Sequence, residues 1–124
     1  MADLSRYKDF IEKGVLYLAT SGPKGRPNLV CVMGCRLVAK DTICATDNMM
    51  GKTRKNIARN SSVAVVCGKG TEWYQLKGTA KQHRKGKWMG FVSKLPINKG
   101  ADPHAAVLIK IREVYDLWEG KRLA

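Results

Sequence analysis

Residues 15–38 read VLYLATSGPKGRPNLVCVMGCRLV, in which two apolar runs flank a cluster of turn residues. The first run covers 15–20 and the second 29–38, and both are rich in residues that strands favour. The segment between them, 21–27, holds two glycines and two prolines, which favour tight turns. Antiparallel strands can be joined by such a connection, so this part of the chain is expected to form a β-hairpin.

The rest of the chain continues the strand-rich pattern, with a few short helices between the strands. The expected order is helix 4–13, strands 15–20, 29–38 and 42–46, helix 52–60, strands 63–67 and 73–82, helix 87–95 and strand 105–118. Many antiparallel neighbours and few helices indicate a mainly β fold, a small β-barrel or sandwich with short flanking helices. No repeat or linker interrupts 1–124, which is expected to be a single domain.

Composition places the chain among globular domains and gives it a strong positive charge. Of the 124 residues, 44% are hydrophobic and 27% are charged, which argues against disorder and fibrous structure. Lysine and arginine number 23 against 10 acidic residues, a net charge of +13. This surplus favours an anionic partner, which could be a phosphorylated cofactor, a nucleic acid or an anionic membrane surface. Charge alone does not choose among them.

The sequence predicts neither a membrane span nor export. No apolar run approaches the length of about 18 residues that a spanning helix needs, and residues 1–14 lack the apolar core of a secretory signal. The four cysteines, Cys31, Cys35, Cys44 and Cys67, lie inside apolar runs, where a free thiol packs as a small apolar residue. We therefore expect reduced thiols in a cytoplasmic protein.

A phosphate site is predicted at Gly51-Lys52-Thr53, where a short helix follows a strand and a polar loop. The free N–H groups and the dipole of a helix start both favour negative charge. Lys52 would add a positive charge and Thr53 a hydroxyl donor. An ordinary exposed basic helix start is the alternative interpretation.

Protein-based catalysis and metal binding have little support. His83 and His104 are isolated, and the spacing of Cys31 and Cys35 is not that of a zinc site, so no metal is expected. No nucleophile motif or pair of carboxylates stands out, and catalytic residues stay unassigned. The chain is therefore expected to use a borrowed cofactor or to catalyse nothing.

A basic run spans 81–87, and Trp73, Tyr74 and Trp88 lie near it in the sequence. Basic residues interleaved with aromatic ones are typical of nucleic-acid grooves. A solvated strand end beside core aromatics accounts for the same pattern more simply. Nucleic acid is accordingly the less favoured partner.

Three segments together resemble the pyridoxamine 5′-phosphate oxidase-like FMN-binding split-barrel family. Residues 14–20 with the turn Gly25-Arg26-Pro27 are similar to the family's opening hairpin. Residues 51–57, followed by 60–65, resemble its phosphate-binding lysine, short helix and strand entry. Residues 74–80 match its strand with an aromatic residue, glycine, a hydroxyl residue and alanine. The resemblance covers 5–118, and the length fits the family's small FMN-binding proteins.

This resemblance implies a six-stranded antiparallel split barrel that forms a homodimer and binds one FMN per subunit at the interface. Cys31, Val32 and Met33 would line the flavin ring, largely through backbone groups, because the Asn-Thr-Trp-like residues common in small members are absent. The other implied cofactor residues are Thr46, Asp47, Asn48 and Met50 along the ribityl chain and ring edge, Lys52 and Thr53 at the phosphate, and Gln75 on a strand that often meets the flavin.

The resemblance also implies a redox role, as a flavin reductase-like oxidoreductase or an electron-transfer protein with unassigned donor and acceptor. Oxidation of pyridoxamine phosphate itself is not expected, because 112–124 lacks the family's substrate residues. A binding module for flavin, deazaflavin F420 or heme, without catalysis, is the alternative.

A dimer is also expected from an apparent surplus of large apolar residues: Trp88, Phe91, Val107, Ile109 and Trp118.

Overall fold

The computed structural model describes residues 2–48 and 50–124. Its strands form one antiparallel sheet, and short helices lie around this sheet. The described elements, in chain order, are η1 (Ser5–Tyr7), α1 (Lys8–Lys13), β1 (Val15–Ser21), η2 (Pro23–Gly25), β2 (Pro27–Met33), β3 (Arg36–Ala39), β4 (Thr42–Asp47), α2 (Gly51–Arg59), β5 (Ser62–Lys69), β6 (Glu72–His83), α3 (Lys87–Ser93), η3 (Pro96–Asn98) and β7 (Ala105–Asp116). The mainly β fold and the hairpin of β1 and β2 are confirmed.

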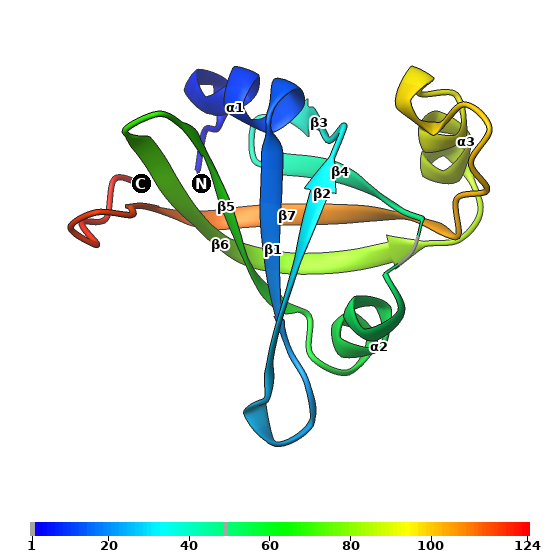
Figure 1. The fold of residues 1–124 in the computed structure, drawn as a ribbon, viewed down its shortest axis with the longest axis horizontal. Coiled ribbons are helices and arrows are strands. Elements are labelled where there is room, and N and C mark those ends of the chain that lie inside the picture. The colour runs from blue at the N-terminus through cyan, green and yellow to red at the C-terminus, as the bar shows by residue number, and fades with distance from the viewer. Residues whose placement is uncertain (1, 49) are drawn as a thin grey trace.

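The strands follow the order β2-β1-β5-β6-β7-β4-β3, and every neighbouring pair is antiparallel. The two edge strands, β2 and β3, are consecutive in the chain, so the sheet curls round until its edges approach each other (Figure 1). The strands β2 and β3 do not pair, and the barrel stays open there. This gap is the split of a split barrel.

The sequence predicts one strand over 29–38, but the chain forms two strands there, which makes seven in the described residues instead of six. The break falls at Gly34, whose φ of 72° lies in the left-handed region that glycine tolerates best. A Cβ at this position would also lie 2.7 Å from side-chain atoms of Ile97. The break reverses the strand's alternation, so Cys35 turns into the core, whereas Cys31 and Met33 stay exposed. One continuous strand over 29–38 would place Cys31, Met33 and Cys35 on the same face, and the break at Gly34 removes Cys35 from it.

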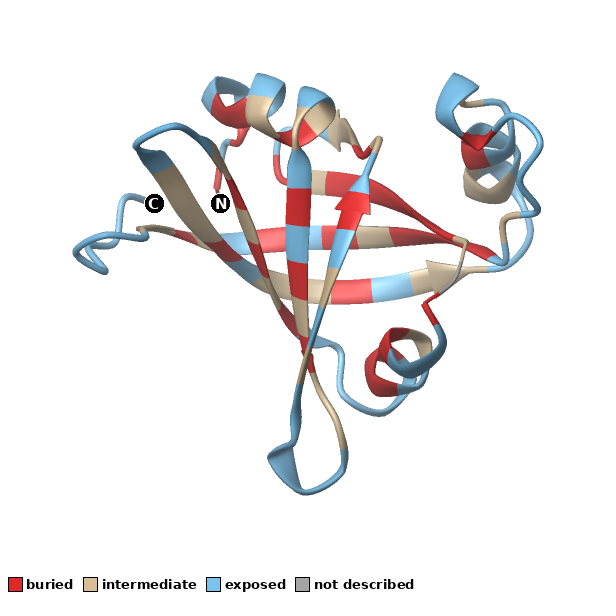
Figure 2. Ribbon diagram, viewed as in Figure 1, coloured by how far each residue is buried: buried red, intermediate tan, exposed pale blue. Residues whose placement is uncertain are grey.

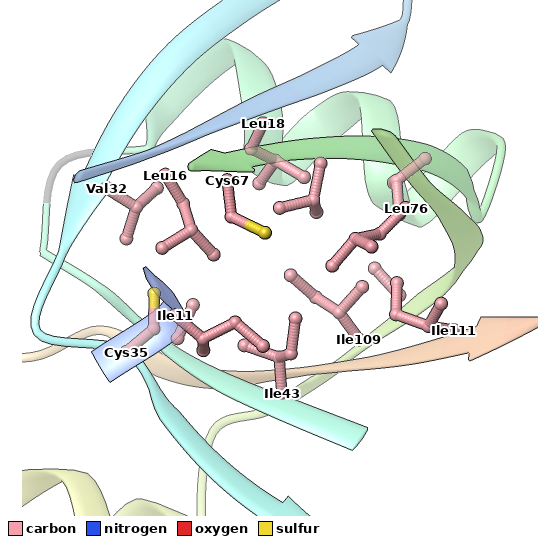
Figure 3. Packing of buried hydrophobic residues seen from close by; sticks show 14 of the residues in the cluster. Ile11, Leu16, Leu18, Val32, Cys35, Ile43, Cys67, Leu76, Ile109 and Ile111 are labelled. Carbon is pink, nitrogen blue, oxygen red and sulfur yellow. The ribbon is translucent and has the colours of Figure 1, made fainter. Parts of the chain in front are cut away.

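Alternation along the strands separates the core from the outer surface. On β1, Leu16 and Leu18 are buried and Tyr17 is exposed, and Figure 2 shows the same alternation on neighbouring strands. Figure 3 shows buried side chains from both halves of the sheet meeting in the interior. Val107 and Ile109 belong to this core, at 1% and 2% exposure. These two residues are therefore not part of a surplus of large apolar residues that a dimer would cover.

The short helix α1 covers one end of the barrel, where Ile11 is fully buried and the Tyr7 and Tyr74 rings pack with centroids 4.6 Å apart. From the same helix, Glu12 accepts a hydrogen bond from the backbone N–H of Leu37 on the edge strand β3, at 3.0 Å.

In residues 2–48 and 50–124, no helix has the length and apolar character needed to cross a membrane.

Candidate functional site

A pocket of about 350 Å³, here called the split pocket, adjoins β2, one of the two edge strands at the split. It lies between β2 and the end of β4, and the η3 turn closes one side. Most of its surface is apolar. Its lining residues are Val30, Cys31, Val32, Met33, Thr46, Asn48, Met50, Ile97 and Asn98. Six of the cofactor residues implied by the family resemblance meet here, from segments separated by a whole strand and loop.

A chain of amide hydrogen bonds forms the polar part of the split pocket. Asn98, which is 4% exposed, donates from Nδ2 to Val92 O at 2.7 Å and to Thr46 Oγ1 at 3.0 Å. Its Oδ1 accepts a hydrogen bond from Asn48 Nδ2 at 3.2 Å. Asn98 therefore holds Thr46 and Asn48 in place, although it comes from a loop before β7. Sequence reasoning missed it, because a single asparagine after a proline carries no signal of this contact.

A second pocket, of about 290 Å³, lies between α2 and the β1–β2 turn and is here called the basic pocket. Four cations line it, Arg26 from the turn and Lys52, Lys55 and Arg59 from α2. None of its lining residues in the described chain is acidic, so the local potential is positive. The remaining lining residues are Gly22, Pro23, Pro27, Asn28 and Asn56.

Helical spacing places three of these cations in the same pocket. Positions 52, 55 and 59 are three and seven residues apart, so their side chains share one face of α2. Asn56 on this face donates from Nδ2 to Thr20 Oγ1 at 3.0 Å and fastens the helix to β1. Of these three cations, the sequence prediction named only Lys52. The periodicity of the basic residues in 52–59 would have indicated Lys55 and Arg59 as well.

Asp47 lies behind the start of α2 rather than in either pocket. Its side chain is 1% exposed, and Oδ1 accepts the backbone N–H of Met50 at 2.9 Å. Arg54 donates to it twice, from Nε to Oδ2 at 2.7 Å and from Nη2 to Oδ1 at 3.2 Å. Burial by itself would raise the pKa of the Asp47 carboxyl, but the bonds from Arg54 and Met50 outweigh burial and hold this pKa below its usual value. The ionised carboxylate fixes the first turn of α2 and, with it, the position of Lys52.

Thr53 is also behind the surface of the basic pocket. It is 1% exposed, and its Oγ1 accepts a hydrogen bond from Asn28 Nδ2 at 3.1 Å. Asn28 lines the pocket, so Thr53 joins β2 to α2 and orients a pocket residue.

Gln75 is the one implied cofactor residue that lies away from both pockets and from the residues that support them. It belongs to a row that crosses the outer face of the sheet through register partners on five adjacent strands. The row, here called the outer row, is Cys31, Tyr17, Val66, Gln75 and Tyr115. Three strand spacings of about 4.8 Å separate Gln75 from Cys31, which is too far for both to contact one ring edge in the same subunit.

Comparison with known proteins gives consistent matches over nearly the whole chain. The family model described as pyridoxamine 5′-phosphate oxidase matches residues 5–118. The uncharacterized protein MJ0282 of Methanocaldococcus jannaschii is 30% identical over 115 residues, covering 89% of this chain and 77% of that protein.

Solved structures give the same fold. HupZ of Group A Streptococcus superposes with a TM-score of 0.86 at 25% identity, covering 96% of this chain and 97% of that one. An FMN-binding protein from Syntrophomonas wolfei superposes with a TM-score of 0.78 at 14% identity, over 92% of this chain and 85% of that one.

Proposed function

The chain belongs to the pyridoxamine 5′-phosphate oxidase-like FMN-binding split-barrel family, and from this premise we propose that it binds FMN across the split pocket and the basic pocket. The observation that carries the proposal is that a cationic pocket and a mainly apolar pocket lie next to each other. FMN has the matching division, with a phosphate at one end and a flat conjugated ring at the other.

The two pockets are neighbours along two segments of the chain. On β2, Asn28 lines the basic pocket and Val30 lines the split pocket. Around the start of α2, Lys52 lines the first and Met50 the second. From Asn28 to the end of β2 at Met33 is about 17 Å at the rise of an extended strand, which gives an elongated molecule room to lie along it.

The chemistry of the lining residues fits this orientation. Lys52, Arg26 and the N-terminal end of α2 would hold the phosphate, since free N–H groups and cations both favour an anion. Val32, Met33 and Ile97 would pack against the ring, and Thr46 and Asn48 would serve its polar edge. The bound flavin supplies the redox chemistry, and the protein binds it, orients it and limits its contact with water.

We place the function among oxidoreductases or electron-transfer proteins, with donor and acceptor unassigned.

Burial raises the pKa of the Cys35 and Cys67 thiols to about 12 and that of Cys44 to about 11, so these three stay protonated and unreactive. Reduced thiols of this kind suit a reducing compartment, and the proposal therefore includes a cytoplasmic location.

A visible spectrum of the purified protein, followed by extraction and mass measurement of any chromophore, tests the assignment. FMN absorbance at one flavin per chain is the expected result. A protein that is colourless and takes up no FMN on reconstitution would refute flavin binding, and a Soret band would redirect the assignment to heme.

Deazaflavin F420 is the second candidate cofactor, because the family includes proteins that bind it. The basic pocket has four cations, whereas a phosphate monoester carries a charge of about −2. The extra cations would suit a cofactor whose tail bears more than one anion. The mass of the extracted chromophore separates F420 from FMN.

A homodimer is part of the proposal, because dimers are common in this family and the outer row presents apolar residues beside the split pocket. Tyr17 and Met33 are 40% and 60% exposed on this face. A two-fold contact across the outer face would carry the partner subunit's Gln75 toward the split pocket, which a single subunit cannot do. This arrangement would give Gln75 its implied contact with the flavin.

Tyr17→Lys should convert the dimer into a monomer, because it introduces a charge into the apolar face proposed to become buried. Light scattering after size exclusion measures the mass. Leu117→Lys is the matched control, since Leu117 has nearly the same exposure, 42%, but lies beyond β7 outside the outer row. A wild-type monomer that carries flavin, or equal dissociation of both variants, would contradict the dimer.

A further inference from the structure

A second strongly basic surface lies on the outer face of the sheet formed by β4, β7 and β6. Three hollows of about 500, 320 and 260 Å³ adjoin one another, the first and third on this face and the second where β6 meets Ile57 and Ala58 of α2. The first and second share Lys81, and the first and third share Lys110. The second also contains Arg84 and the third Arg112. These four cations are here called the basic strip.

Strand register places two of these cations, Lys81 and Lys110, on one face of the sheet. Lys110 on β7 lies between Thr42 on β4 and Thr79 on β6, and Lys81 is two residues further along β6. The intervening residue, Ala80, pairs with Ile109 and points into the core, so Lys81 and Lys110 both point outward. Ser61, Thr42 and Thr79 add hydroxyl groups to the same hollow.

Few acidic groups accompany the basic strip in the part of the chain that the structure describes. The ion pairs among the described residues join Lys13 to Asp9, Arg54 to Asp47 and Arg122 to Glu113, and none includes the strip. Asp41 is the single carboxylate that lines these hollows; it is 8% exposed and accepts a hydrogen bond from Thr42. Neighbouring like charges on adjacent strands repel, so an external anion would stabilise this surface.

The extent and the chemistry of the strip favour a chain of phosphates over other anions. Lys81 pairs in register with Leu108, and Arg112 lies four residues further along β7, a span of about 13 Å. One small anion cannot contact all of it. Lysine, arginine, serine and threonine are the usual donors to nucleic-acid phosphates. A protein partner would instead require large apolar anchors at the centre, and Leu108 is the largest apolar side chain in the main hollow.

From these observations we propose that the basic strip binds the sugar–phosphate backbone of single-stranded nucleic acid, without reading base sequence. The site shares no lining residue with the basic pocket or the split pocket, so the inference stands apart from flavin binding. The aromatic residues that the sequence places near the basic run do not all accompany it. Trp73 lies at the opposite end of β6, where its Nε1 donates to Gly70 O at 2.8 Å. Backbone contacts therefore outweigh stacking in this proposal.

Fluorescence anisotropy with labelled oligothymidine, repeated over a range of salt concentrations, tests the inference on the full chain. Each phosphate contact to a single strand contributes a slope of about −0.7 in log K against log salt, so four contacts give a slope of about −2.8. Lys81→Gln combined with Lys110→Gln should reduce its magnitude by about 1.4 and weaken binding about 25-fold at 0.1 M salt. Lys8→Gln with Lys69→Gln removes the same charge from α1 and the far end of β5, and should change affinity much less.

Two further measurements separate backbone binding by the strip from misfolding and from a general affinity for polyanions. The Lys81 and Lys110 variant should take up FMN as the wild type does, which would show that it is folded and that its flavin site is intact. Poly-L-glutamate and anionic lipid vesicles serve as competing polyanions. Equal losses in the two charge variants, tighter binding of duplex than of single strand, or equally tight binding of either competitor would overturn the proposal.

Discussion

Gly78→Ala is expected to lower the free energy of unfolding by more than about 3 kcal/mol. A Cβ at position 78 would lie 1.8 Å from the carbonyl oxygen of Lys110 and 2.9 Å from the Cα of Ile111. Both are backbone atoms of β7, the strand that pairs with β6 on one side and β4 on the other, so they cannot move without disturbing both ladders. Overpacking a core with flexible side chains costs about 1–3 kcal/mol, and this rigid contact should cost more. Domains of this kind have about 5–15 kcal/mol of stability in total.

Urea unfolding of the wild type and the variant measures this effect, with Gly90→Ala as the matched control. Gly90 lies in α3, and nothing stands within 4 Å of a Cβ added there. Alanine is the better helix former by about 1 kcal/mol, so the control should be slightly more stable than the wild type. A Gly78→Ala midpoint close to that of the wild type would show that the β6–β7 contact relaxes more easily than its geometry indicates.

Lys52→Ala should weaken FMN binding about 10- to 150-fold while leaving riboflavin binding nearly unchanged. The two ligands differ only in the phosphate, and Lys52 is exposed on the first turn of α2, in the basic pocket. A hydrogen bond to a charged group contributes about 1.5–3 kcal/mol, which corresponds to this range of affinity. Thr53→Ala should have a smaller effect in the same direction, because its hydroxyl acts through Asn28.

Fluorescence titration of both flavins into wild type, Lys52→Ala and Lys69→Ala measures this selectivity. Lys69 lies at the end of β5, away from both pockets, and its loss should produce only a small change that salt screens. If Lys52→Ala weakens the two flavins equally, or neither, the phosphate binds elsewhere.

Local sequence signals predicted the strands and helices well, because glycine, proline and apolar periodicity act over a few residues. The strand β1 and the helix α2 are confirmed within one residue of their predicted ends, and β2 begins two residues before its predicted start. The break at Gly34 escaped prediction, and Ile97, the side chain that a Cβ at this position would meet, lies 63 residues later in the chain. A single glycine between apolar residues looks the same whether a strand continues or turns.

The candidate site was predictable where one segment supplies neighbouring residues, and not where distant segments meet. Cys31, Val32 and Met33 follow one another on β2, and the structure places all three in the split pocket. Asn98 could not be found in this way, because its contacts with Thr46 and Asn48 join parts of the chain about 50 residues apart. The family resemblance gave Asp47 a place along the ribityl chain or ring edge of the flavin. Its burial and its pairing with Arg54 make it a support for α2.

The open barrel also determines how the protein shields its sheet from self-association. An edge strand exposes N–H and C=O groups to which a strand of another molecule can add. At β3, Glu12 already occupies the N–H of Leu37 and α1 stands beside the strand. At β2 the corresponding groups border the split pocket, where a cofactor would cover them. A ligand bound there would therefore act as the missing neighbour of the last strand, and loss of that ligand would leave this edge free to recruit another chain.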